Sequence, residues 1–162
     1  MLTSACPVPG PKDKSMTADE LIALARQAAL KAYAPYSRFQ VGCAIESVDG
    51  TIVTGANMEN ACYRLGLCAE QSALTAAQHS FGLDKVARIA VSGGRLESGG
   101  LAGEITCTPC GGCRQAIFEA ACLSGRDVEI ICSNGKGEGV EKHSIRELIP
   151  HGFGPANLAD AG

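Results

Sequence analysis

The sequence lacks three features, and each absence argues against a class of function. It has no basic excess, because 17 acidic residues outnumber 14 basic ones and give a formal net charge of −3. Surfaces that bind nucleic acid normally carry excess Lys and Arg, so we expect no nucleic-acid partner. No apolar run approaches the ~20 residues of a membrane helix, so we expect no membrane partner. No charged segment followed by an apolar one opens the chain, so we expect a cytoplasmic protein rather than a secreted one.

The length of 162 residues fits one domain with an ordinary core, and no internal repeat is present. Residues 1–15 contain three prolines, one glycine and three charged residues, a composition that predicts a flexible leader. We therefore expect residues 16–162 to form a single domain.

Cysteine, by contrast, is abundant, with nine in the chain. A disulfide framework would suit a small secreted protein, but the missing secretion signal favours free thiols in a reducing compartment. Cys43, Cys62, Cys122 and Cys132 lie in apolar or strand-like segments. We expect most of them to be small buried side chains without a chemical role.

The hydrophobic pattern alternates between helical and strand periods. Thr17 and Glu20 form a capping box that predicts a helix start, and apolar residues at helical spacing follow until Pro35. Further helices are predicted at 67–78, 109–123 and 145–149, and strands at 39–48, 51–55, 86–92, 128–133 and 140–144. Long loops are expected at 57–66 and at the glycine-rich 93–108. This order predicts an α/β fold with three α-β-α layers, in which helices flank a mixed sheet of about five strands.

Two short motifs carry chemical information: residues 68–70 read Cys-Ala-Glu and residues 109–113 read Pro-Cys-Gly-Gly-Cys. Cys110 and Cys113 are three residues apart at a helix start and therefore share one face. Cys68 begins a second helix, so two helix N-termini, which favour thiolates by lowering the cysteine pKa, can converge on one ion. Three thiolates predict a Zn²⁺ site whose fourth position is free for water, as in catalytic zinc sites.

Glu70, two residues after the first of these ligands, is the predicted catalytic residue. Zinc lowers the pKa of its water toward ~7, and a nearby carboxylate can take that proton and later protonate a ring nitrogen and a leaving amine. A Cys-x-Glu box followed by Pro-Cys-x-x-Cys is typical of zinc deaminases of nucleobases. On these residues alone, other interpretations stay open. Glu70 could be an ordinary acidic residue of a first helical turn, Cys107 could close a structural zinc site, or the Cys-x-x-Cys pair could be a redox dithiol.

Further motifs make the chain resemble the small cytidine deaminases with three cysteine zinc ligands, over roughly residues 17–158. Beside the two zinc boxes, the similar stretches are Ala-Pro-Tyr-Ser-Arg-Phe at 34–39, Val-Gly at 41–42, Asn-Met-Glu-Asn-Ala at 57–61, Glu-Leu-Ile-Pro at 147–150 and Phe-Gly-Pro at 153–155. The zinc boxes specify only the deaminase superfamily. The segments at 34–39 and 57–60 indicate the branch that acts on free nucleosides.

The resemblance implies hydrolysis of cytidine and deoxycytidine to uridine and deoxyuridine, with release of ammonia, in pyrimidine salvage. It implies that Cys68, Cys110 and Cys113 hold one Zn²⁺ per subunit and that Glu70 shuttles protons. Its small-molecule partner would be a pyrimidine nucleoside.

The resemblance also implies a set of substrate contacts. Asn57 and Glu59 would hold the ribose hydroxyls, since an amide and a carboxylate can share donor and acceptor bonds with a diol. Phe39 would pack against the pyrimidine ring. The backbone amide of Ala69 would meet the pyrimidine carbonyl, and the carbonyl of Thr108 would meet the amino group.

A homotetramer whose sites are completed by neighbouring subunits is a further implication. Phe153 matches the aromatic residue that reaches a neighbour's site, and Tyr63 would lie at the site wall. Gln71 departs from the family, because members with three cysteine ligands usually carry an arginine there that offsets thiolate charge. Arg114 or the helix dipoles are candidates for the missing charge. The long segment 94–107 is a second departure, without an assigned role.

Two other functions remain as alternatives. A nucleoside-antibiotic deaminase of the blasticidin type, or a deaminase of bases within nucleic acid, would apply the same chemistry to another substrate. The acidic charge disfavours the polymer, and Asn57 and Glu59 favour a small molecule that carries ribose. A non-catalytic zinc-binding module is disfavoured by the three-ligand site and its attendant Glu70.

Overall fold

A mixed sheet organises residues 15–159, the part of the chain that the computed structural model describes. Five strands follow the order β2-β1-β3-β5-β6, and β4 pairs with the end of β3. The strands are β1 (Phe39–Ser47), β2 (Ile52–Ala56), β3 (Val86–Glu97), β4 (Gly100–Ala102), β5 (Glu129–Asn134) and β6 (Glu141–Ser144). β3 and β5 are parallel and the other neighbouring pairs are antiparallel. The predicted α/β fold with a mixed sheet is confirmed, with one strand more than expected.

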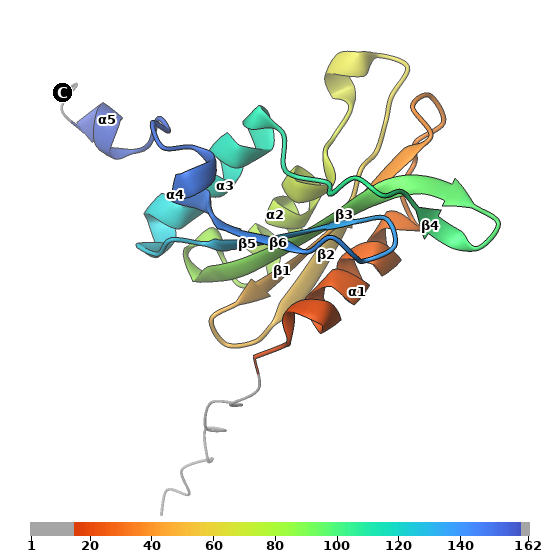
Figure 1. Ribbon diagram of the computed structural model, residues 1–162. Coiled ribbons are helices and arrows are strands. Elements are labelled where there is room, and N and C mark those ends of the chain that lie inside the picture. The colour runs from red at the N-terminus through yellow and green to blue at the C-terminus, as the bar shows by residue number, and fades with distance from the viewer. Residues whose placement is uncertain (1–14, 160–162) are drawn as a thin grey trace, which may run out of the picture.

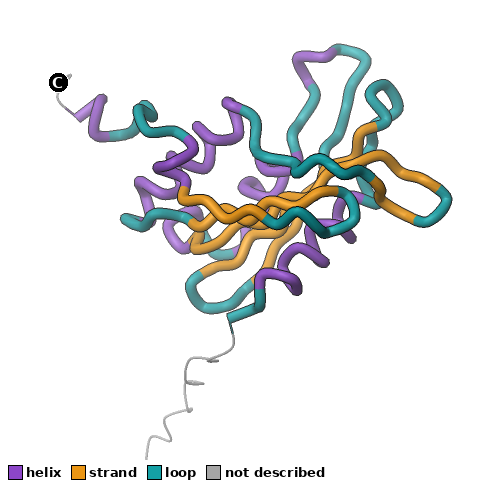
Figure 2. Tube along the Cα trace, viewed as in Figure 1, coloured by secondary structure: helices purple, strands orange, loops and turns teal. Residues whose placement is uncertain are grey.

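Helices cover both faces of this sheet (Figure 1). Helix α1 (Ala18–Ala29) packs on β1 and β3 from one face. The opposite face is covered by α2 (Ala69–Ser80), α3 (Gly111–Ser124) and α4 (Ile145–Leu148). Shorter elements are the 3₁₀ turns η1 (Tyr63–Leu65) and η2 (Leu83–Lys85) and the terminal α5 (Ala156–Ala159). In Figure 2, the loop that carries η1 extends beyond the packed helices and strands at one end of the molecule.

Alternate residues of each strand face the two helical layers, as the pleat requires. On β3, Ala90 belongs to a small core cluster beneath α1, together with Leu21. Its neighbour Val91 belongs to a larger cluster between the sheet, α2 and α3, together with Ile117. The sheet therefore has a lightly packed face and a heavily packed face.

Glycines bring one helix on each face into close contact with the sheet. A Cβ atom at Gly42 would lie 1.9 Å from the carbonyl oxygen of Ala25 in α1. A Cβ atom at Gly55 would lie 2.4 Å from the amide nitrogen of Ala73 and 2.7 Å from the carbonyl oxygen of Ala69, both in α2. Only glycine permits such an approach. Gly55 thereby fixes the first turns of α2 against β2.

The glycine-rich segment after residue 92 forms a hairpin instead of the predicted loop. β3 continues to Glu97 and returns as β4, with Leu96 opposite Leu101. At Gly94 a Cβ atom would lie 2.0 Å from the carbonyl oxygen of Ala102, so the missing side chain permits close backbone approach. The glycine here permits close contact between two backbone segments and does not indicate an irregular loop.

Helix α1 ends at Ala29, earlier than its apolar spacing and Pro35 suggest. The chain leaves the helix because Tyr33 pairs with the segment before α2. Its backbone N–H donates to the Asn57 carbonyl at 3.0 Å, and its carbonyl accepts from the Glu59 N–H at 2.7 Å. Tertiary pairing outweighs local helix propensity at this point.

The eight cysteines of the described part are free thiols. Cys43 and Cys132 are fully buried, as expected, whereas Cys122 is half-buried and Cys62 is exposed. The predicted leader lies outside the described residues except for Ser15, whose hydroxyl is bonded to Arg88 at 3.1 Å. No helix within residues 15–159 is long and apolar enough to cross a membrane.

Candidate active site

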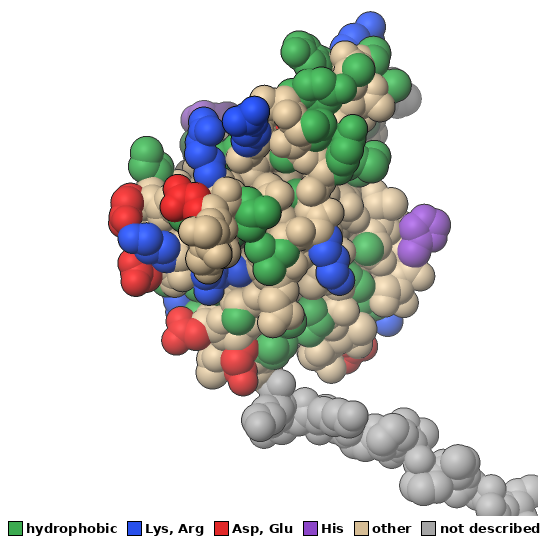
Figure 3. All heavy atoms as spheres, turned by 90° about the vertical axis from the view of Figure 1, so that its right-hand side faces the viewer, with side chains coloured by type: hydrophobic (Ala, Val, Ile, Leu, Met, Phe, Trp, Pro, Cys, Tyr) green, Lys and Arg blue, Asp and Glu red, His purple; other side chains and the backbone are tan. Residues whose placement is uncertain are grey.

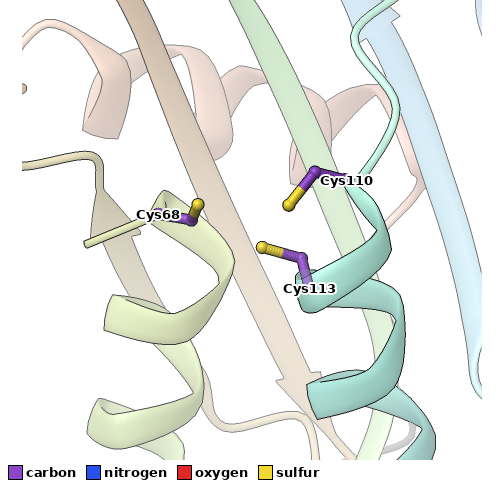
Figure 4. Close-up of side chains that lie close together, drawn as sticks. All are labelled: Cys68, Cys110 and Cys113. Carbon is purple, nitrogen blue, oxygen red and sulfur yellow. The ribbon is translucent and has the colours of Figure 1, made fainter. Parts of the chain in front are cut away.

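The N-termini of α2 and α3 meet above the heavily packed face of the sheet. Cys68 is the N-cap of α2, Cys110 is the N-cap of α3, and Cys113 lies in the first turn of α3. Their side chains point toward one another from the two helices (Figure 4). The three sulfur atoms lie within 4.8 Å of one another. We call these three residues the cysteine cluster.

The cysteine cluster fits a zinc ion. Zn–S bonds of ~2.3 Å at tetrahedral angles place the sulfur atoms about 3.8 Å apart, which the observed spacing allows. Among residues 15–159, no fourth Cys, His, Asp or Glu joins this group. Cys107 therefore does not close a four-cysteine site. The cluster thus offers three candidate ligands, the number that characterises catalytic zinc sites.

The three thiols differ in their electrostatic surroundings. The pKa of Cys110 is lowered, chiefly by the backbone N–H of Cys113 at the start of α3. Burial raises the pKa of Cys68 and of Cys113. The lowered pKa expected at a helix N-terminus is therefore seen for Cys110, whereas burial dominates at Cys68 and Cys113. A divalent cation would offset the unfavourable burial of these two thiolates.

Arg114 directs its guanidinium group to backbone carbonyls. Its Nε donates to Pro109 at 2.8 Å and its Nη1 donates to Leu148 at 3.2 Å. The side chain thus joins the segment before Cys110 to α4. Gln71 lines a separate hollow of about 540 Å³ between α2 and α3. Within residues 15–159, neither side chain forms a hydrogen bond with a sulfur atom of the cluster.

Glu70 lies beside the cluster in the first turn of α2, with only 4% of its surface exposed. Burial raises its pKa, against the opposing effects of its own backbone N–H and the Cys113 thiol. No Lys, Arg or His within residues 15–159 forms an ion pair with it. A buried carboxylate next to a predicted metal and without a cation is well suited to exchange protons.

A cavity of about 300 Å³ joins the two cysteine motifs to the segment that precedes α2. This volume is at the lower end of the range for small-molecule sites. Predicted site residues that line it are Asn57, Glu59, Cys68, Ala69, Glu70, Thr108 and Cys110. Residues that sequence reasoning did not assign to the site also line it, namely Val41, Met58, Gly66, Leu67 and Cys107. Of these, Val41 and Met58 lay within stretches that marked the family resemblance, whereas Cys107 was considered only as a possible fourth zinc ligand.

The side chains of Asn57 and Glu59 are fixed by backbone groups. Asn57 Oδ1 accepts from the Val41 N–H at 2.8 Å, and its Nδ2 donates to the Phe39 carbonyl at 3.0 Å. Glu59 accepts from the Tyr36 N–H at 2.8 Å. Its pKa is lowered, first by the hydroxyl of Ser37. Each side chain keeps further hydrogen-bonding capacity for a ligand diol.

Three predicted contact residues do not line this cavity. Phe39 is 40% exposed and lines a neighbouring cavity. Tyr63 is 81% exposed and lines a shallow hollow beside Glu59. Phe153 is 58% exposed in the C-terminal segment. One chain therefore brings together the residues predicted for the reaction centre and for sugar binding, but not the predicted aromatic contacts.

The comparison with known proteins agrees with this geometry. A family model described as the cytidine and deoxycytidylate deaminase zinc-binding region matches residues 15–124. The chain belongs to this deaminase family. Its zinc-binding motifs thus belong to a longer stretch of matching sequence.

Individual members of the family resemble the chain over most of its length. A cytidine deaminase of Halalkalibacterium halodurans is 39% identical over 140 residues, which cover 86% of this chain and 96% of the relative. One of Mycobacterium tuberculosis is 38% identical over 139 residues, which cover 83% and 87%. The crystal structure of the Burkholderia pseudomallei cytidine deaminase has a TM-score of 0.72 and 40% identity, and the match covers 85% of this chain and all of that one. The predicted family and its fold are confirmed.

Proposed function

We propose that the protein hydrolyses cytidine and deoxycytidine to uridine and deoxyuridine, with release of ammonia, and serves pyrimidine salvage. One observation carries this proposal: Cys68 and Cys110 of the cysteine cluster, the buried Glu70 and the fixed side chains of Asn57 and Glu59 border a single cavity. Relatives named cytidine deaminase support the choice of substrate. Together they favour a free nucleoside over the antibiotic or the nucleic acid.

The roles of the reacting groups follow from their positions in the cavity. When bound, Zn²⁺ supplies the Lewis acidity that makes water a strong nucleophile near neutral pH. Glu70 takes a proton from the attacking water, delivers it to ring atom N3, and then moves a proton to the departing amino group. The carbonyl of Thr108 accepts a hydrogen bond from that amino group. The N–H of Ala69 donates to the pyrimidine carbonyl and fixes the position of the ring.

The sugar is recognised at the other end of the cavity. Asn57 and Glu59 bind the ribose hydroxyls with the hydrogen-bonding capacity that the backbone of β1 and the turn at Tyr36 leave free. Because these side chains are already fixed, little side-chain entropy is lost when substrate binds. Phe39 packs against the pyrimidine from the neighbouring cavity.

A substrate panel tests this function. With zinc-loaded protein, cytidine and deoxycytidine should lose their absorbance as uridine products form. An oligonucleotide that contains cytosine and an aminoacyl nucleoside antibiotic of the blasticidin type should turn over at least about 100-fold more slowly, since each lacks the fit at the sugar end. Faster turnover of either competitor would overturn the assignment, and zinc binding without turnover of any of them would indicate a non-catalytic module.

We also propose a homotetramer in which neighbouring chains complete each site. Exposed apolar side chains gather at the end of the molecule that carries η1 (Figure 3), and they are Tyr36, Met58, Tyr63 and Leu65. Tyr63 and Phe153 are exposed and neither lines its own chain's cavity, which supports contact with a neighbouring chain. Sedimentation equilibrium should give four times the chain mass. A fully active monomer would contradict this arrangement.

The family's zinc thiolates require reduced cysteines, which supports the proposal of a cytoplasmic location. The eight free cysteines of the described residues agree with it. We further propose that residues 16–162 act as one catalytic domain. A variant that begins at Met16 should keep its zinc and its turnover, and loss of either would show that the leader is required.

A further inference from the structure

Two cavities of similar size adjoin at the site, and one residue lines both. The cavity of about 300 Å³ contains Glu70 and part of the cysteine cluster, and the second, of about 290 Å³, lies over the start of β1 and the β3–β4 hairpin. Within residues 15–159, Cys107 is the one residue that lines both. Its backbone is fixed, because its N–H donates to the Ser133 carbonyl at 3.1 Å.

The position of the Cys107 thiol is made possible by a glycine beneath it. A Cβ atom at Gly93 would lie 2.7 Å from Cys107 Sγ and 3.0 Å from Phe39 Cε1. The sulfur thus lies beside the ring of Phe39 in the space above Gly93. Cys107 is therefore the side chain that the walls of the two cavities share.

The orientation of the substrate determines which ring atom meets this partition. In cytosine, N3 and C5 flank the reacting carbon C4 on opposite sides. Helices α2 and α3 lie on opposite sides of the cysteine cluster (Figure 4). With C4 at the cluster and N3 toward Glu70 on α2, the C5 edge faces the segment that leads into α3, where Cys107 is located.

We propose that the Cys107 thiol determines the size of the C5 substituent that the site accepts, with the second cavity as the space behind it. This proposal rests on the proposed function. Cys107 is then a specificity residue, which touches the substrate ring but neither binds the metal nor moves protons. A change of one heavy atom in an apolar wall alters discrimination about tenfold or more.

The test compares kcat/KM for 5-iodocytidine and cytidine in a set of variants. C107A should raise the ratio of the two values about tenfold, because the shortened side chain opens the second cavity to iodine. C107V should lower the ratio. G93A should lower it too, because its methyl group pushes the Cys107 sulfur toward the zinc cavity. The electronic effect of iodine is the same in every variant and cancels.

Controls separate specificity from folding and from metal binding. C107S keeps the side chain nearly isosteric and should stay close to wild type, and C122A changes a half-buried cysteine outside both cavities and should not alter the ratio. Each variant should retain one zinc per chain. An unchanged ratio in folded C107A, or loss of its zinc, would overturn the proposal.

A binding measurement keeps this test independent of turnover. Calorimetry with 5-iodouridine and uridine should give Kd ratios that shift in the same direction as the kinetic ones. If wild type turns over no cytidine, the proposed function fails, while the binding ratio still decides whether Cys107 limits the C5 substituent.

Discussion

Within residues 15–159, one glutamate is buried on each side of the sheet, and the two have different partners. On the α1 face, Glu46 is 2% exposed, and it accepts from Arg88 Nη1 and from the Met16 N–H, both at 2.9 Å. Arg88 also bonds Glu129 at 2.8 Å, so three charges form a row across β1, β3 and β5. On the opposite face Glu70 is equally buried, but it has no cation among the described residues and its pKa is raised.

This difference shows on which side of the sheet the fold leaves a buried carboxylate unpaired and available to a ligand. Burying a carboxylate without a partner is strongly unfavourable, so a chain normally pairs it, as Arg88 pairs Glu46. Around Glu70 the nearest groups are thiols that themselves become anionic when they bind metal. A bound divalent cation would offset part of this negative charge, and the N-termini of α2 and α3 favour the remainder. The α1 face is complete as it stands.

The largest expected effect is loss of the metal. C113S should reduce zinc to well below one ion per chain and turnover to below detection, because one of three ligands is weakened beside the buried Glu70. C132S, on the same face but outside the cluster, should keep its zinc. Metal content by mass spectrometry and a cytidine assay check both variants. Full zinc in C113S would show that the cluster has been assigned the wrong ligands.

The next effect belongs to the α1 face. R88L should lower the free energy of unfolding by about 3–5 kcal/mol, since it leaves Glu46 buried without its cation. Zinc content and turnover per folded molecule should stay near wild type. Denaturant titration at fixed protein concentration measures the loss, with the exposed R126L as a control within about 0.5 kcal/mol of wild type. A loss below about 1 kcal/mol would mean that the buried row contributes little.

A smaller, matched pair of changes tests whether the two faces act independently. G42A and G55A each force a methyl group against helix backbone and should each destabilise the fold by about 1–3 kcal/mol. Only G55A should also weaken zinc binding and turnover, because the displaced helix carries Cys68 and Glu70. Thermal unfolding and zinc titration distinguish the variants. Equal effects on zinc would show that the two faces are coupled.

Local signals in the sequence predicted the elements well where capping and alternation decide them. Thr17 and Glu20 announced the start of α1, and the two cysteine motifs located the starts of α2 and α3 within about two residues. The cysteine cluster was predictable because Cys110 and Cys113 are set by helical spacing alone. Its union with Cys68 was expected because Cys68 begins a second helix whose N-terminus can converge on the same ion.

Features set by contacts between distant residues were not predictable. The glycines at 93 and 94 suggested a loop in the sequence. In the fold they are needed because other groups pack closely against them, the Cys107 sulfur at Gly93 and the Ala102 carbonyl at Gly94. Tyr33 draws the chain out of α1 only because it pairs with residues 57–59. The ion-paired row around Arg88 likewise depends on strand register, which no local pattern reveals.

The central claim is that one buried glutamate does chemistry and the other holds structure, and a comparison of E70Q with E46Q tests it most directly. E70Q should keep one zinc and its thermal stability while kcat for cytidine falls about 10²–10⁴-fold. E46Q should show a lower Tm and a kcat per folded molecule within about twofold of wild type, because Glu46 lies on the face without the site. If E70Q keeps kcat within tenfold of wild type, or if both variants lose activity in parallel, the account is wrong.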